Sequence, residues 1–298
     1  MSRTVDAATR REFLTASAVT LPFSASAASG ATQATRPGLL AGKVTVIYGA
    51  AGAIGGAVSR AFAREGAQLF LAGRTLENVK ALESELKQSG AVASAAQVDA
   101  LDRGAIEKHL DEVVRTSGGL DISFNLIGLG GEQGKALTAM NQEAFAIAIN
   151  TAMRTHFFTA TAAARHMQAK GGGVLLALTA QVARKPYVGS AGFGVACAAI
   201  EGLWRQLAIE LGPAGIRCVT LRSSGSPDAP GVTAAIAEHA RAAGVSREAF
   251  EARIAEKTML KRMPRMAEIA DAAVLMASDR ASAVTAAVLN ATCGEIAD

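Results

Sequence analysis

The 298-residue chain has few of the residues that mark several classes of site. Its three cysteines, Cys197, Cys218 and Cys293, are odd in number, far apart and free of CxxC or histidine clustering. That distribution indicates neither a disulfide framework nor a zinc site, so we expect no metal. No run approaches the roughly 20 apolar residues that a membrane-spanning helix needs. The 30 basic and 26 acidic residues are scattered, without the basic stripe that a nucleic-acid partner requires.

The first 38 residues differ from the rest because they carry no periodic hydrophobic pattern. Within them, TRREFLT (residues 9–15) precedes a mildly apolar stretch and small-residue A-x-A sites such as residues 25–27. That order resembles a twin-arginine export signal, which predicts a periplasmic protein. The alternative is a disordered arm in which the arginine pair falls by chance, and the protein then stays in the cytoplasm.

From residue 43 onward, short β-branched runs alternate with amphipathic helical stretches. The expected strands are VTVIY (44–48), QLFLA (68–72), AVASAAQV (91–98), LDISFNLI (120–127), VLLALT (174–179) and IRCVTL (216–221). Strands separated by helices of about ten residues or more imply right-handed crossovers and a parallel sheet covered on both faces. Half of the residues are hydrophobic, which is enough for a sizeable core. We therefore predict a single doubly wound, Rossmann-type α/β domain over residues 39–298.

Residues 226–262 interrupt this alternation with two helical pieces joined at Gly244. The segment follows the sixth expected strand, at the carboxyl edge of the sheet where ligands bind in such folds. We therefore predict a lid over a small-molecule substrate. A helical hairpin without a role in binding is the alternative.

A glycine-rich turn follows the first expected strand. VTVIYGAAGAIGGAV places Gly49, Gly52 and Gly55 between that strand and the first helix. Glycines there let the backbone approach a pyrophosphate, whose charge the helix N-terminus stabilises. The spacing predicts a dinucleotide-binding site.

The same turn, with Ile54 before Gly55, resembles the TGxxxGIG fingerprint of the short-chain dehydrogenase/reductase family. The resemblance runs from residue 43 to the C-terminus: Asp99 matches an adenine-contacting aspartate, NLIG (125–128) matches NNAG, and residues 278–294 match the last loop and strand. It implies an oxidoreductase that binds a nicotinamide dinucleotide. The implied cofactor-binding residues are Gly49, Gly52, Ile54, Gly55, Arg74, Asp99, Asn125 and Gly128.

The end of the second expected strand bears on the choice of cofactor. LFLAGRT puts Gly73 where NAD-using members carry an acid, and Arg74 follows. An acid would hold the ribose 2′-hydroxyl and repel a 2′-phosphate, whereas glycine leaves room for the phosphate and arginine offers it a guanidinium. We therefore predict NADP rather than NAD. An ordinary solvated arginine at a strand end is the alternative.

The family's catalytic constellation of Asn, Ser, Tyr and Lys is largely missing. The sequence offers Ala180 at the serine, Phe193 at the tyrosine and Cys197 at the lysine, and only Asn150 matches. Phenylalanine has no proton to transfer, and a neutral thiol cannot replace an ammonium. The chain has two tyrosines in all, and neither is followed by a lysine at four or seven residues.

Replacement groups lie near these positions in the sequence. The best candidate is Tyr187, because a phenol close to Lys185 could have its pKa lowered. Thr179, Gln181, Arg184 and His156 are weaker candidates, each with an ordinary structural explanation.

Three functions therefore remain open. The first is an NADP-dependent oxidoreductase acting on a small carbonyl or alcohol, with Asn150 and Tyr187 as its catalytic candidates and a non-standard route for the proton. The second is a catalytically silent NADP-binding sensor or assembly subunit, and the third is an ene-type reductase. The helix that carries Phe193 could also build a subunit interface, so we expect a homo-oligomer, a dimer or a tetramer. Packing of the same apolar residues inside the core is the alternative.

Overall fold

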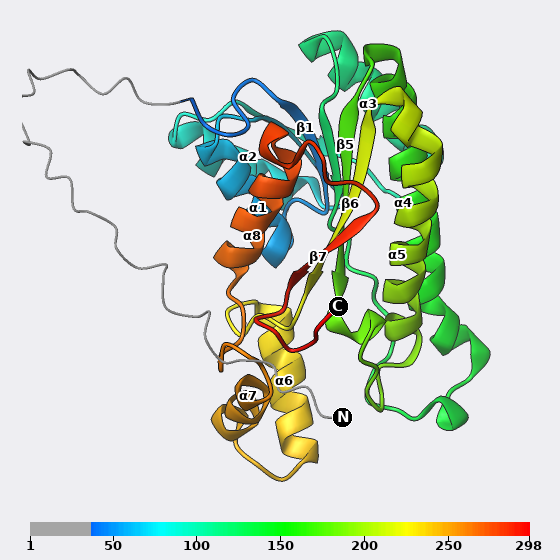
Figure 1. Ribbon diagram of the computed structural model, residues 1–298, viewed down its shortest axis with the longest axis vertical. Coiled ribbons are helices and arrows are strands. Elements are labelled where there is room, and N and C mark those ends of the chain that lie inside the picture. The colour runs from blue at the N-terminus through cyan, green and yellow to red at the C-terminus, as the bar shows by residue number, and fades with distance from the viewer. Residues whose placement is uncertain (1–36) are drawn as a thin grey trace, which may run out of the picture. The chain divides into compact units, whose positions relative to one another are not determined.

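The computed structural model describes residues 37–298, which form one compact unit. Seven parallel strands make a single sheet in the order β3-β2-β1-β4-β5-β6-β7 (Figure 1). The strands are β1 (Val44–Tyr48), β2 (Gln68–Gly73), β3 (Ala93–Gln97), β4 (Ile122–Asn125), β5 (Gly173–Ala180), β6 (Ile216–Ser223) and β7 (Ala287–Ala291). Each of the six strand segments predicted from the sequence overlaps one of these strands, and the seventh strand lies within residues 278–294. The predicted doubly wound α/β fold is confirmed.

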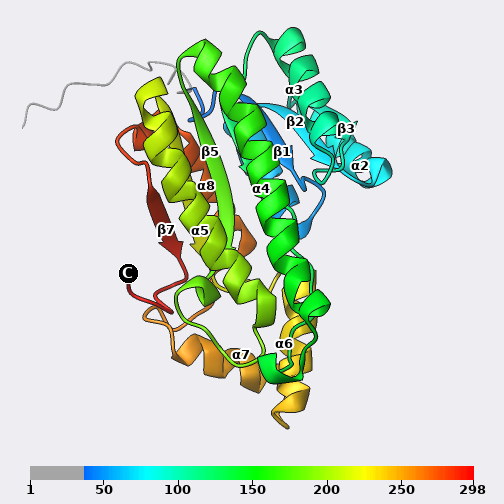
Figure 2. The same ribbon diagram turned by 90° about the vertical axis from the view of Figure 1, so that its right-hand side faces the viewer.

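Helices cover both faces of the sheet (Figure 2). They are α1 (Ala53–Arg64), α2 (Leu76–Gln88), α3 (Arg103–Ser117), α4 (Gln142–Lys170), α5 (Ala191–Leu211), α6 (Pro230–Ala242), α7 (Arg247–Glu256) and α8 (Met266–Ala277). One buried apolar cluster joins the sheet to α3, α4 and α5, and the other joins it to α1, α2 and α8. Burial on both faces explains why the strands read as nearly continuous apolar runs.

Three helices begin at side-chain caps that the sequence supplies. The side-chain Oδ1 atoms of Asp102 and Asn141 accept hydrogen bonds from the backbone N–H groups of Ala105 and Ala144, at the starts of α3 and α4. Ser246 does the same for α7. Such caps satisfy backbone donors that have no partner within the helix.

The segment between β6 and β7 holds α6 and α7, joined at Gly244, whose φ of 66° is in the left-handed region that favours glycine. Both views place these two helices beyond the carboxyl ends of the strands (Figures 1 and 2). Among residues 37–298, no helix is both long and apolar enough to cross a membrane. The TRREFLT motif lies outside the described residues, so the export signal stays a prediction.

Candidate cofactor and active site

The turn between β1 and α1 has the tight backbone geometry that the glycines predicted. Gly49 has a φ of 75°, and a Cβ atom there would lie 2.6 Å from the carbonyl oxygen of Leu126. A Cβ atom at Gly55 would lie 2.2 Å from the carbonyl oxygen of Gly49. No side chain fits at either position without moving backbone, so both glycines are required for this turn.

The N-terminus of α1 is suited to a phosphate group. Gly52 is its N-cap residue and carries no side chain that could satisfy the first N–H groups, unlike the caps of α3 and α4. Free N–H groups and the positive end of the helix dipole together favour an anion. The residues present therefore fit the pyrophosphate of a dinucleotide.

Gly73 and Arg74 end β2 at the same edge of the sheet. A Cβ atom at Gly73 would lie 2.7 Å from a methyl carbon of Val79, so a larger side chain would press on α2. Arg74 is exposed, and its guanidinium forms no ion pair with any residue between 37 and 298. Its carbonyl oxygen accepts a hydrogen bond from Gln97, which anchors the backbone and leaves the guanidinium available.

The other predicted cofactor residues lie along the carboxyl ends of β1, β3 and β4. Asp99 is exposed and accepts the N–H of Leu101, while Gly128 is exposed with open space around its Cα atom. Asn125 is buried, where its amide donates to Thr159 and its carbonyl oxygen accepts the N–H of Ile127. Asn125 therefore joins β4 to α4 and shapes the loop beyond the strand. Ile54 packs against the apolar cluster under α1.

Ala180, Phe193 and Cys197 come together where β5 ends and α5 begins. Ala180 is the last residue of β5, Phe193 lies in the first turn of α5, and both pack against the cluster beneath α4 and α5. Cys197 is 1% exposed, and burial raises its pKa to about 11 despite an opposing hydrogen bond from the backbone of Ala180. The thiol is therefore protonated and uncharged at neutral pH.

Asn150 lies on the outer face of α4. The exposed side chains of this helix recur at Ile147, Asn150, Arg154 and Phe157, a spacing of three or four residues that defines one face. Ala152, two residues on, points the opposite way and is fully buried. On the same face, Arg154 donates to the backbone carbonyl of Leu101 and Ile147 lies near Gly130, so Asn150 faces the loops that follow β3 and β4 and not the buried cluster that holds Cys197.

Tyr187 lies on the loop between β5 and α5 and is 40% exposed. Its hydroxyl donates to Gln133 Oε1 over 3.3 Å, a long and weak hydrogen bond. Burial raises the pKa of this phenol, and its electrostatic interactions with Cys197 and Glu295 raise it further. The direction is opposite to the one predicted from Lys185, because burial has the largest effect on the pKa of this phenol. The Lys185 ammonium lies 3.3 Å from the backbone carbonyl of Glu295.

Sequence reasoning missed two charged groups behind this site. Arg222, in β6, is 2% exposed and donates through Nε and Nη2 to both carboxylate oxygens of Glu201, each over 2.8 Å. Thr179 donates to the same carboxylate, and Asp298 pairs with the other side of the guanidinium. The sequence did contain a signal: Arg222 interrupts an otherwise apolar strand, and Glu201 interrupts an apolar helix. A buried charge requires a partner, so the two residues could have been paired from the sequence.

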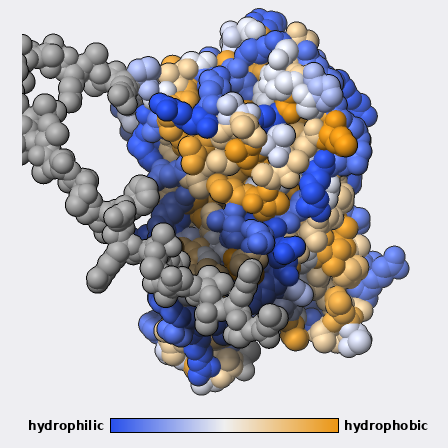
Figure 3. Space-filling model, viewed as in Figure 1, coloured by the Kyte–Doolittle hydropathy of each residue, from blue (hydrophilic) through white to orange (hydrophobic). Residues whose placement is uncertain are grey.

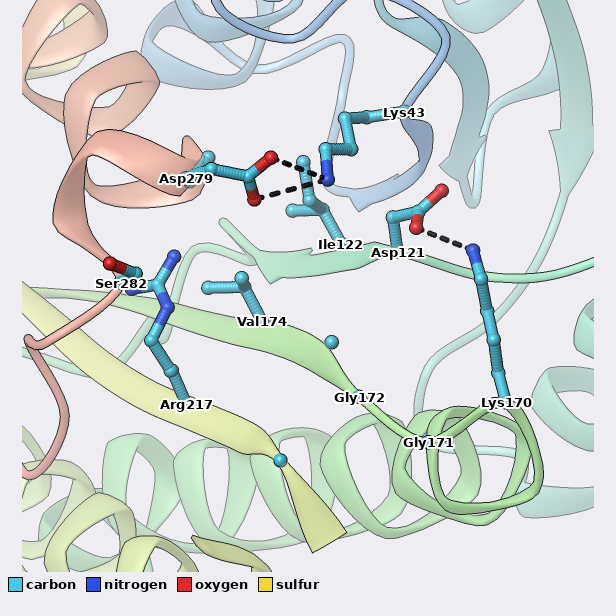
Figure 4. A pocket seen from close by; sticks show the side chains of 13 residues that line it. Lys43, Asp121, Ile122, Lys170, Gly171, Gly172, Val174, Arg217, Asp279 and Ser282 are labelled. Carbon is cyan, nitrogen blue, oxygen red and sulfur yellow. Dashed lines mark hydrogen bonds and ion pairs between the residues drawn. The ribbon is translucent and has the colours of Figure 1, made fainter.

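A polar pocket of about 370 Å³ lies at the other edge of the sheet, where the strands begin. Figure 4 shows that its charges are already matched: Lys43 pairs with Asp279, and Lys170 pairs with Asp121. Arg217 donates to three backbone carbonyls near the end of α8. These contacts are structural, so the carboxyl edge remains the candidate site.

Comparison with known proteins decides the family. The family model described as enoyl-(acyl carrier protein) reductase matches residues 49–295, nearly the whole described unit. The chain belongs to the short-chain dehydrogenase/reductase family. The resemblance drawn from the glycine turn and the later motifs is thereby confirmed.

Named relatives of this short-chain dehydrogenase/reductase span several substrates. A probable galactose dehydrogenase, GalD, from Rhizobium meliloti (strain 1021) is 30% identical over 244 residues, covering 81% of this chain and 90% of that protein. The 7alpha-hydroxysteroid dehydrogenase of Clostridium sardiniense is 26% identical over 247 residues, covering 83% and 90%. The structure of NAD⁺-bound xylitol dehydrogenase matches with a TM-score of 0.80 and 22% identity, covering 86% and 99%. At that identity the structural likeness shows the fold alone.

Proposed function

We propose that this short-chain dehydrogenase/reductase is an NADP-dependent oxidoreductase that interconverts a small alcohol and its carbonyl compound. Three features carry the proposal because together they fit a dinucleotide: a glycine turn, a helix N-terminus without a side-chain cap, and an exposed Arg74 that has no ion-pair partner within residues 37–298. The bound nicotinamide supplies or takes the hydride. The named relatives, a galactose and a hydroxysteroid dehydrogenase, support the substrate class because both names describe oxidation of an alcohol.

The chain's own residues must then bind the substrate and handle the proton. Tyr187 is the candidate donor, since Phe193 and Cys197 occupy the family's tyrosine and lysine positions. The raised pKa keeps its phenol protonated at neutral pH, so it can donate a hydrogen bond to a substrate oxygen. Exchange of the weak bond to Gln133 for such an oxygen costs little.

Cofactor choice can be tested without a substrate by thermal unfolding with NADPH, NADH or no ligand. Ligand at 100 times its dissociation constant stabilises the folded protein by about 2.7 kcal/mol. We expect a larger shift with NADPH, and we expect Arg74→Ala to abolish the difference while the control Lys80→Ala, on the exposed face of α2, preserves it. Equal shifts for the two cofactors in the wild type would refute the preference, which matters because the xylitol dehydrogenase neighbour holds NAD⁺.

Catalysis can be tested by following NADPH oxidation against small ketones. If Tyr187 donates, Tyr187→Phe should remove the turnover of the wild type, whereas Phe193→Ala should leave the proton step intact. A catalytically silent binder would instead show no turnover until Ala180→Ser, Phe193→Tyr and Cys197→Lys are combined. General acid catalysis typically raises the reaction rate by about 10²–10⁴-fold, so either result should be measurable above the background rate of NADPH oxidation.

Reduction of a polarised carbon-carbon double bond is a second candidate, favoured by the description of the matching family model. In that reaction the proton can come from water, which suits a site with Ala180 and Phe193 in place of a serine and a tyrosine. The product separates the two functions: an enone should give a saturated ketone in this case and an allylic alcohol in the first. Tyr187→Phe should then have little effect.

We also propose that α4 and α5 build a homo-oligomer and that α6 and α7 form the lid. Apolar side chains reach the surface on the side of the molecule where α5 lies (Figure 3). The exposed large apolar side chains of these two helices include Phe157 of α4 and Val195 and Ile209 of α5, the last 74% exposed. Light scattering should show a dimer or tetramer that Phe157→Asp with Val195→Asp dissociates, and a monomeric wild type would contradict it.

A further inference from the structure

The segment that follows β7 brings a carboxylate to the candidate site. Because β5, β6 and β7 are parallel neighbours, the loops after them meet at one edge of the sheet. Ser224, just past β6, donates its hydroxyl to Glu295 Oε2 over 2.6 Å. The backbone N–H of Glu295 donates to Thr292, which closes a tight turn after β7.

This segment is held at its far end as well. Asp298 pairs with Arg222, whose guanidinium is oriented by its two hydrogen bonds to Glu201. Asn290 of β7 donates to the backbone carbonyl of Ile296 over 2.8 Å. Contacts on both sides of Glu295 therefore position its carboxylate, and Arg222 acts as a positioning residue.

Glu295 and Tyr187 occupy the same neighbourhood. Lys185, two residues before Tyr187, donates to the Glu295 backbone carbonyl and has its ammonium 4.0 Å from Oε1. The charge of Glu295 is also among the causes that raise the pKa of the Tyr187 phenol, so the two side chains are electrostatically coupled. The Glu295 side chain is 13% exposed, which leaves it reachable from solvent.

The chemistry of the carboxylate indicates what it would hold. Oε2 accepts the Ser224 hydroxyl, while Lys185 at 4.0 Å from Oε1 offsets the charge without a hydrogen bond. Oε1 is therefore the free acceptor. It suits a neutral hydrogen-bond donor better than a second cation, because the charge of Lys185 already balances that of Glu295. A hydroxyl group is such a donor.

We propose that Glu295 accepts a hydrogen bond from a substrate hydroxyl next to the oxygen that Tyr187 contacts, so that the preferred substrates are vicinal diols and α-hydroxy carbonyl compounds. The inference rests on the proposed function, and it adds the substrate class and a specificity residue. A donor on Tyr187 and an acceptor on Glu295, which Lys185 links to the Tyr187 loop, would match the two adjacent oxygens of such a compound. A lone alcohol or ketone uses only the phenol.

The first test needs no substrate and asks whether the Glu295 carboxylate lies close enough to Tyr187 to affect its ionisation. Titration of the phenol by ultraviolet absorbance, with Tyr187→Phe identifying its transition, should show that Glu295→Gln lowers the pH at which Tyr187 ionises. The control Glu77→Gln, at an exposed carboxylate of α2, should leave that transition at its wild-type pH. An unchanged transition in Glu295→Gln would overturn the proposal.

The second test compares 1,2-cyclohexanediol with cyclohexanol as substrates in the presence of NADP⁺. A hydrogen bond to a charged group corresponds to roughly a 10- to 100-fold preference in kcat/KM for the diol. Glu295→Gln should reduce that preference, mainly by raising the KM for the diol, and leave cyclohexanol nearly unaffected. Asp298→Ala should act in the same direction by loosening the segment.

The outcomes separate the two proposals. Equal use of diol and monool by the wild type overturns the substrate class and leaves the oxidoreductase standing. Absence of turnover with every alcohol and ketone overturns both the proposed function and the diol preference, while the titration still shows whether Glu295 faces Tyr187.

Discussion

His156 is an imidazole buried between α4 and α5, with its ring edge-on to Trp204 at 5.0 Å. Its Nδ1 has no hydrogen-bond partner among the described residues. Burial lowers its pKa from 6.5 to about 3, since a charged imidazole there would lose its hydration without gaining a counter-ion. The residue is neutral in the folded protein and takes no part in the proposed site.

His156 makes folding stability depend on pH. Below pH 6.5 the unfolded chain protonates this histidine while the folded protein does not until about pH 3, so stability present above pH 6.5 is lost as the pH falls. The loss is about 1.4 kcal/mol per pH unit, or about 2 kcal/mol by pH 5. In urea unfolding at pH 7 and pH 5, His156→Leu should lose less stability than the wild type.

His109 provides the companion measurement, because burial lowers its pKa to about 4. His109→Leu should also reduce the loss between pH 7 and pH 5, and the two substitutions together should reduce it further. An acid loss of the same size in the wild type and in His156→Leu would contradict this account.

The helices α4 and α5 pack closely because a glycine lies at their contact. Gly192, in the first turn of α5, sits where a Cβ atom would lie 2.0 Å from the carbonyl oxygen of Phe145 in α4. Such an approach lets the two helices share the apolar cluster that includes Ala196 and Ile200. The loop that carries Tyr187 leads directly into this helix.

Gly192→Ala should therefore destabilise the protein by about 1–3 kcal/mol, since the methyl group would force α5 away from α4. Gly202→Ala is the matched control in the same helix, where the nearest atom to the new Cβ is the tip of Arg205 at 4.0 Å. It should stabilise by about 0.5–1 kcal/mol, because alanine favours helix over glycine. Chemical denaturation measures both, and equal effects would refute the steric explanation.

At the scale of the whole molecule, residues 37–298 contain both apolar clusters and the complete sheet. The stability of the fold should therefore reside in this unit. Deletion of residues 1–36 should leave the melting temperature and the NADPH-induced shift nearly unchanged. A large fall in either value would show that the first residues contribute to the fold.

Export by the twin-arginine route remains a proposal carried by TRREFLT. That route accepts folded proteins, so a nucleotide could be bound before export. Replacing Arg10 and Arg11 by lysine should retain the protein in the cytoplasm, whereas the wild type should be recovered from the periplasm by cell fractionation. Wild-type protein found only in the cytoplasm would exclude the signal.

The sequence by itself determined the fold class, the family and the dinucleotide turn. These features depend on local patterns: apolar runs as long as a strand, helices of predictable period and glycines at fixed spacing. The absence of a Tyr and Lys pair was also readable directly, because it is a matter of residue identity at each position. These conclusions required only the identities and spacing of residues that are close together in the sequence.

Tertiary structure alone decided which side chains meet. Asn150 matched a motif by spacing, and only the structure shows that it shares the exposed face of α4 with Arg154, which contacts the loop after β3. The pKa of Tyr187 was predicted to fall, and it rises chiefly because the fold buries the phenol, while Lys185 contacts Glu295, 110 residues away in the chain. Such contacts depend on how distant loops converge after the sheet has formed, and on the burial that follows, neither of which local spacing encodes.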